Sequence, residues 1–92
     1  MFVALLRLDL RLPDASSLKD KRSVVKGVAA TLRKLNCAVA EVDHQDLRQR
    51  ATLAVAYVSG DSRHANEVVS KALDFIEASV DGDVIDVQIE VL

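Results

Sequence analysis

Hydrophobic and polar residues alternate along the first twelve positions of the chain. The apolar side chains on one side are Phe2, Ala4, Leu6, Leu8, Leu10 and Leu12. Polar residues interrupt the other side at Arg7, Asp9 and Arg11. Because successive side chains of a strand point to opposite faces, this pattern predicts a β-strand over residues 2–12 with one buried face. Pro13 ends it, since proline has no N–H to donate to a neighbouring strand.

Two later segments follow a helical period. In residues 17–36 the apolar side chains recur at three- and four-residue spacing, at Leu18, Val25, Val28, Ala29, Leu32 and Leu35. A second stripe comes after Gly60 and Asp61, at Val68, Val69, Ala72, Leu73 and Ile76. Both stripes predict amphipathic helices. Ser17 and Asp20 resemble a capping box with a shorter acid in the first helix, and Asp61 is the expected N-cap of the second.

Three further strands complete the pattern. CAVAEV at residues 37–42 and ATLAVAYVS at residues 51–59 are short apolar runs, and residues 85–91 alternate again. The order β-α-β-β-α-β predicts the α+β class with the ferredoxin-like split βαβ arrangement, in one domain over residues 1–92. Because strand–helix–strand crossovers are right-handed, both helices are expected on one face of a four-stranded antiparallel sheet.

The face of the predicted sheet away from the helices has two unlike halves. In the outer strands it is polar and could form cross-strand pairs, from Arg7, Asp9, Arg11, Asp86, Gln88 and Glu90. The two middle strands offer no polar side, and an apolar sheet face usually packs against a cover. We therefore expect a homodimer formed through this open face. The alternative is that the small alanines of these strands tolerate exposure.

Charge is unevenly distributed along the chain. The net charge at pH 7 is -2, but residues 1–50 carry +4 and residues 51–92 carry -6 when Lys, Arg, Asp and Glu are counted along the sequence. A nucleic-acid partner would therefore have to bind a local basic patch, because the overall field of the protein does not attract a polyanion.

Basic residues gather at the start of the first predicted helix, at Lys19, Lys21, Arg22 and Lys26. All except Lys21 fall along one side of that helix, together with Arg33. Cationic side chains beside the unpaired N–H groups of a helix start favour an anion. The segment therefore predicts a phosphate-binding stripe. The alternative is a solvated charged face with Asp20 as local compensation.

The connection between the two middle strands holds most of the other reactive side chains, at Glu41, Asp43, His44, Asp46, Arg48 and Arg50. One hypothesis is a metal-binding or acid–base site made by Asp43, His44 and Asp46. Their spacing matches no known ligand signature. The other is turn chemistry, in which aspartates cap their own backbone and Arg48 or Arg50 pairs with Asp43 or Asp46. The second hypothesis is compatible with a pinned loop that contacts a partner.

Motifs that the chain lacks argue against several classes of enzyme and binding protein. The chain has no CxxC, GxxxxGK, HExxH or GxSxG motif and no glycine-rich anion loop between its first strand and helix. Base stacking on strand aromatics would have only Tyr57 in the middle strands. We expect no catalytic residue, cofactor or resident metal. The single Cys37 fits a reducing cytoplasm, and no apolar stretch is long enough to span a membrane.

Three segments resemble the YlxP-like family of bacterial domains of unknown function: SLKDKRSVVKG, AEVDHQDLRQRA and SRHANEVVSKALDFIE. The resemblance covers nearly the whole chain and implies a ferredoxin-like domain. Family members are often encoded beside genes for translation and ribosome maturation, which suggests a role linked to RNA or the ribosome. They often carry an aromatic residue where this chain has Arg48, so the resemblance implies no stacking role for that position here.

Two functions from different classes follow. The first is a non-catalytic RNA- or ribosome-associated binding protein that contacts phosphate through the basic helix start, with Arg48 and Arg50 helping. The alternative is a small metal-binding or enzymatic domain that uses the Asp43–His44–Asp46 hairpin, or a homodimeric scaffold.

Overall fold

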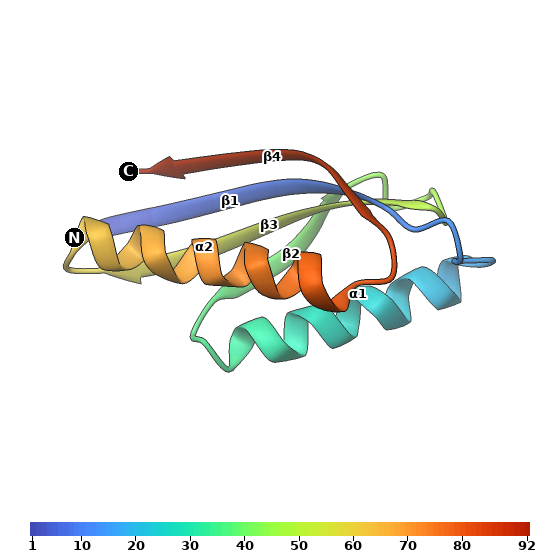
Figure 1. Cartoon of the computed structure of the whole chain (residues 1–92), viewed down its shortest axis with the longest axis horizontal. Helices are drawn as coiled ribbons and strands as arrows, with labels where there is room; N and C mark the ends of the chain where they lie inside the picture. Colours follow the sequence, from blue (N-terminus) through green and yellow to red (C-terminus); the bar gives the residue numbers. More distant parts are fainter.

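The computed structural model describes residues 1–92 and contains two helices and four strands (Figure 1). In chain order these are β1 (Phe2–Arg11), α1 (Leu18–Arg33), β2 (Ala38–Asp43), β3 (Arg50–Ser59), α2 (Ser62–Ser79) and β4 (Asp83–Val91). The strands form one antiparallel sheet in the order β2-β3-β1-β4. This order confirms the predicted α+β, ferredoxin-like architecture, with the first and last strands as neighbours.

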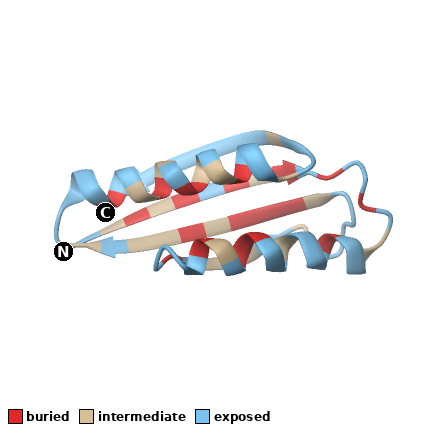
Figure 2. Cartoon of the chain, turned by 60° about the horizontal axis from the view of Figure 1, so that its bottom comes forward, coloured by how far each residue is buried: buried red, intermediate tan, exposed pale blue.

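Both helices cover the same face of the sheet, and the other face is open (Figure 1). The core lies between the helices and the two central strands, where the buried stretches of β1 and β3 face the buried sides of α1 and α2 (Figure 2). Its largest members are Leu6, Leu8, Leu10, Leu32, Leu53, Val55, Val69 and Ile76. The alternation predicted for the first strand is thus confirmed from residue 4 onward, whereas Phe2 is exposed at the end of the sheet.

The first helix begins as expected and ends earlier than its apolar stripe suggests. Ser17 is the N-cap, and its side chain accepts a hydrogen bond from the Asp20 N–H. The helix ends at Arg33, and a turn leads to Asn36 in the left-handed region, with φ of 63°. Leu35 lies in that turn and is 41% exposed, so its predicted place on the buried stripe is wrong.

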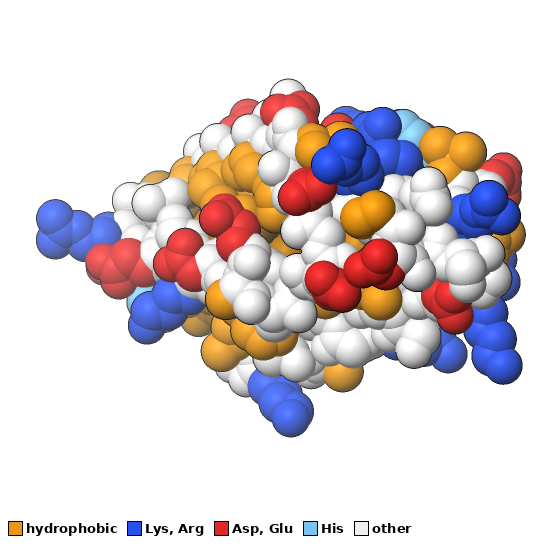
Figure 3. Space-filling view, turned by 45° about the vertical axis from the view of Figure 1, so that its right-hand side comes forward, with side chains coloured by type: hydrophobic (Ala, Val, Ile, Leu, Met, Phe, Trp, Pro, Cys, Tyr) orange, Lys and Arg blue, Asp and Glu red, His pale blue; other side chains and the backbone are white.

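The edge strand β4 is only partly covered by α2. Its helix-side residues Val87, Ile89 and Val91 stay between 36% and 40% exposed, and Figure 3 shows hydrophobic side chains reaching the surface between charged groups. A bulge between the partners of Asp9 and Leu10 shifts the register of this strand. An irregular, half-covered edge is a common feature of natural sheets.

The predicted cross-strand charge pairs do not form. The register sets Arg7 opposite Gln88 and Asp9 opposite Asp86. Arg11 instead donates from its Nε to Asp83, at 3.1 Å, where β4 begins. The turn before Asp83 needs Gly82, because a Cβ there would collide with the backbone oxygen of Arg11.

Candidate functional site

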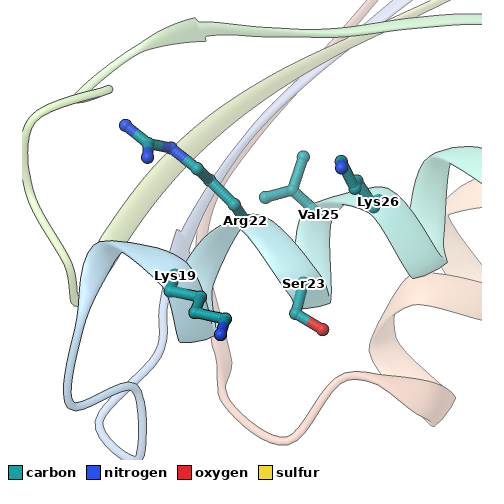
Figure 4. Close-up of a pocket in the computed structure, with 5 residues that line it drawn as sticks. All are labelled: Lys19, Arg22, Ser23, Val25 and Lys26. Carbon is teal, nitrogen blue, oxygen red and sulfur yellow. The ribbon is translucent and has the colours of Figure 1, made fainter.

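The outer side of α1 carries a shallow, open hollow of about 410 Å³. It is lined by Lys19, Arg22, Ser23, Val25 and Lys26, which fall on one side of the helix (Figure 4). Arg22 and Lys26 extend to one side of the hollow, and Lys19 lies beside Ser23 on the other (Figure 4). All three cations are exposed, and none has a carboxylate within ion-pair distance. The predicted basic stripe therefore exists, and its charge is free to meet an anion.

The acid beside these cations is occupied elsewhere. The Asp20 carboxylate accepts hydrogen bonds from the Ser16 N–H at 3.0 Å and from the Ser16 hydroxyl at 2.6 Å. These bonds hold the pKa of Asp20 below its ordinary value. Only half of the predicted capping box forms: Ser17 caps the Asp20 N–H, whereas the Asp20 carboxylate bonds Ser16 and not the N–H of Ser17. Because the chain caps its own helix start, an incoming anion would meet the lysine and arginine side chains.

Lys21 belongs to the inner side of the same helix and is 0% exposed. Its Nζ donates to three backbone carbonyls, those of His44 at 2.8 Å, Gln45 at 3.0 Å and Arg50 at 3.3 Å. The prediction that Lys21 contacts phosphate is wrong, because no solvent-borne anion can reach it. A signal in the sequence could have shown this, since position 21 falls between Leu18 and Val25 on the apolar stripe of the helix.

Glu41 neutralises the buried ammonium. Its Oε2 lies 2.8 Å from Lys21 Nζ, and the Glu41 side chain is only 15% exposed. The contact is an ion pair without hydrogen-bond geometry, because the three N–H bonds of the ammonium point at carbonyls. The β2–β3 register places Glu41 opposite Leu53, on the helix side of the sheet. Glu41 therefore helps to hold the hairpin in shape, as the conformational hypothesis expects, and its carboxylate is directed to Lys21 and not to a partner.

The hairpin backbone is pinned at its first turn. His44 adopts φ of 60°, a left-handed conformation that is uncommon for a residue with a side chain. Its N–H donates to Asp43 Oδ1 at 2.7 Å, and its carbonyl accepts from Lys21 Nζ and from the Leu47 N–H. The expected turn chemistry is thus confirmed for Asp43, and the loop is held in one shape.

The predicted hairpin ion pairs are wrong. The only cation near Asp43 is Arg7 of β1, at 3.9 Å, so Asp43 does not pair with an arginine of its own loop. Asp46 and Arg48 are exposed at the hairpin tip without an ion-pair partner. Arg50 is half-buried at the start of β3, and its Nε is buried without a hydrogen-bond partner.

A polar chain on the open face was missed by the sequence analysis. Thr52 is 0% exposed, and its hydroxyl donates to Asp9 Oδ1 at 2.6 Å. The Nδ1 of His44 lies 2.8 Å from the same hydroxyl oxygen. The signal for it was present, because Thr52 is the only hydroxyl-bearing residue between Ala51 and Ala56, at an otherwise apolar strand position. The distance between Asp9 and His44 in sequence hid the connection.

Other candidate groups have no cluster around them. The structure brings no three His, Cys, Asp or Glu side chains into a group that could hold a metal ion, so the Asp43–His44–Asp46 metal hypothesis gains no support from geometry. His64 is exposed and lies with its Nε2 3.3 Å from the Tyr57 hydroxyl. Cys37 is buried, and this burial raises the pKa of its thiol. Neither helix is long and apolar enough to cross a membrane.

Comparison with known proteins agrees with the fold and adds no reaction. A family model described as "Protein of unknown function (DUF503)" matches residues 3–89. The uncharacterized protein YlxP of Bacillus subtilis (strain 168) is 33% identical over 66 residues, which is 71% of this chain and 72% of YlxP.

Two designed proteins share the architecture at low sequence identity. The solution NMR structure of the de novo designed protein LFR1 1, with a ferredoxin fold, is 12% identical with a TM-score of 0.64 over 99% of this chain and 85% of that one. The designed protein Ferredog-Diesel is 8% identical with a TM-score of 0.50 over 96% and 83%. At these identities the similarity supports the fold alone.

Proposed function

The chain belongs to the YlxP-like DUF503 family of proteins of unknown function, and from its surface we propose that it is a non-catalytic RNA-binding protein that associates with ribosomal RNA. Phosphate groups would contact the outer side of α1. The observation that carries the proposal is the set of three exposed, unpaired cations around one hollow, formed by Lys19, Arg22 and Lys26.

The charge distribution supports a localised contact. Residues 51–92 hold only two of the twelve basic residues, so an RNA would be repelled from most of this segment and oriented by α1. Figure 3 shows Lys and Arg side chains projecting on several sides of the molecule, with Asp and Glu side chains between them.

The hairpin tip can extend the basic surface. Lys21 holds the hairpin backbone against the start of α1, so Arg48 lies at the same end of the molecule as Lys19 and Arg22. With aromatic residues at 3% of the chain, base stacking contributes little. Phosphate contacts would therefore position the RNA without selecting a base sequence.

The test is binding of a labelled fragment of structured ribosomal RNA, followed by fluorescence anisotropy across a salt series. We expect affinity to fall as salt rises. The variant Lys19→Glu/Arg22→Glu/Lys26→Glu should lose roughly tenfold or more in affinity, and its salt slope should be shallower by about 2–3. The matched control, with the same change in net charge, is Lys34→Glu/Arg63→Glu/Lys71→Glu and should bind nearly as well as the wild type.

Three results would count against the proposal. The first is affinity that does not change with salt, and the second is an outer-face variant that binds as tightly as the control variant. The third is failure of the wild-type protein to bind ribosomal RNA at low salt.

A homodimer through the open sheet face stays a prediction. The observation that favours it is the uncovered apolar half of that face, where Ala38 and Ala40 are exposed and Val58 is 61% exposed. Sedimentation equilibrium at micromolar concentration tests it. A monomer would remove the dimer without affecting the RNA-binding proposal.

A further inference from the structure

Asp9, Thr52 and His44 form a directed chain of hydrogen bonds on the open face of the sheet. A carboxylate can only accept, so the single hydroxyl hydrogen of Thr52 is used on Asp9 Oδ1, at 2.6 Å. The Thr52 oxygen is then an acceptor for His44 Nδ1, at 2.8 Å. The neutral imidazole therefore carries its hydrogen on Nδ1 and a lone pair on Nε2.

The whole of His44 is held, and not only its ring. Its N–H is bound by the Asp43 carboxylate, its carbonyl by the buried ammonium of Lys21, and its ring by Thr52, which is itself fully buried. A left-handed conformation at a residue with a side chain persists where its surroundings over-determine it, and such positions cluster at functional sites. Nε2 makes no hydrogen bond within the chain, although the residue is part exposed.

The chemistry of this site selects its ligand class. A fixed lone pair repels carbonyl, carboxylate and phosphate oxygens and accepts a hydrogen bond from an N–H or O–H donor. Arg50 occupies the same face of β3 as Thr52, two residues away, and has no ion-pair partner. An acceptor on the same sheet face as an unpaired guanidinium suits a ligand that carries both a hydroxyl and an anionic group.

We propose that His44 Nε2 accepts a hydrogen bond from a ribose 2′-hydroxyl while Arg50 contacts the adjacent phosphate. The inference rests on the proposed RNA binding and names the group by which this protein distinguishes RNA from DNA, since DNA lacks that hydroxyl. The hairpin that carries His44 is fixed to α1 through Lys21, so an RNA strand bound on the outer side of α1 reaches the open face by passing around the hairpin.

The experiment compares an RNA hairpin with the DNA hairpin of the same sequence, and uses long-range ¹H–¹⁵N NMR of the free protein to assign the His44 tautomer. We expect a hydrogen on Nδ1 and an affinity for RNA roughly five- to tenfold higher than for DNA, as one hydrogen bond to a neutral group provides. His44→Asn keeps a residue type that tolerates positive φ. It should bind DNA as the wild type does and should lose the preference for RNA.

A matched variant and a second measurement complete the design. His64→Asn replaces the other histidine, which lies at the start of α2 beside Tyr57, and should leave the preference for RNA unchanged. Thr52→Val keeps the shape of the side chain but removes the hydroxyl that links His44 to Asp9. In this variant we expect both neutral tautomers of His44 to be populated.

The outcomes separate the two proposals. Equal, salt-sensitive binding of RNA and DNA overturns the role of His44 and leaves RNA binding through α1 intact. A hydrogen on Nε2 in the wild-type protein also overturns it. Binding of neither nucleic acid overturns the proposed function and this inference together.

Discussion

The two sides of α1 use the same kind of residue for different purposes. On the inner side, Lys21 is fully buried, binds three carbonyls and is neutralised by Glu41. On the outer side, Lys19 and Arg22 are exposed and have no ion-pair partner. All of them come from one run of charged residues at the start of the helix. The charge of a residue alone therefore does not show whether it supports the fold or is free to bind a ligand.

The difference shows how a buried ammonium helps to hold the hairpin backbone in place. A buried ammonium is costly to desolvate, and it persists only when its hydrogen bonds are satisfied and its charge is neutralised. Lys21 meets both conditions, because its three donors go to the hairpin backbone and Glu41 supplies the opposite charge. The outer cations stay hydrated and need no partner within the chain. They therefore remain available for a phosphate.

The substitution Lys21→Met tests the difference between the two sides of α1 and should have the largest effect. It removes the donor to three carbonyls and leaves the Glu41 carboxylate buried and unpaired, so we expect a loss of about 3–5 kcal/mol in the free energy of unfolding. Urea denaturation followed by circular dichroism measures it. Lys19→Met on the outer side is the control, and an equal loss in both variants would show that the two sides do not differ.

Glu41→Gln should have a smaller effect. The amide keeps the shape and one oxygen near Lys21 Nζ but removes the opposite charge, and we expect a loss of about 1–3 kcal/mol. A double-mutant cycle with Lys21→Met measures the coupling between the two side chains. Additive losses would contradict an energetically important ion pair.

Asp20→Asn tests the start of the helix through pH. The pKa of Asp20 is lowered from its ordinary value of 3.8 by its bonds to Ser16, so the folded state favours the charged form. The resulting stabilisation is complete above that ordinary value and is lost as pH falls through the lower folded-state pKa. Urea denaturation at a series of acidic pH values should show a steeper loss for the wild type than for the variant. Parallel curves would argue against this cap.

The smallest effect on stability is expected from the outer side itself. Lys19→Met and Lys26→Met should each change the free energy of unfolding by less than about 0.5 kcal/mol, as is usual for surface substitutions. Thermal unfolding of both variants checks this. A large loss would show that these cations support the fold and are not free for a ligand.

Much of the architecture could be predicted from hydrophobic periodicity. The period-2 pattern of β1, the helical stripes and the caps at Ser17 and Asp61 are local properties of the chain, and the structure confirms them. The charge pairs of the open face could not be predicted, because they depend on register. The bulge opposite Asp9 and Leu10 shifts the pairing of β4, and Arg11 bonds Asp83 as a result.

The sequence by itself determined the element order, the family and the basic run at the start of α1. Only the tertiary structure decided that Lys21 is a support and that His44, Thr52 and Asp9 meet. The physical reason is that periodicity shows which side of an element is apolar, whereas contacts between residues 9, 44 and 52 exist only once distant segments pack. One local sign of such a contact is a charged residue on the apolar stripe of a helix, because a charge that is buried there needs a partner from a distant segment.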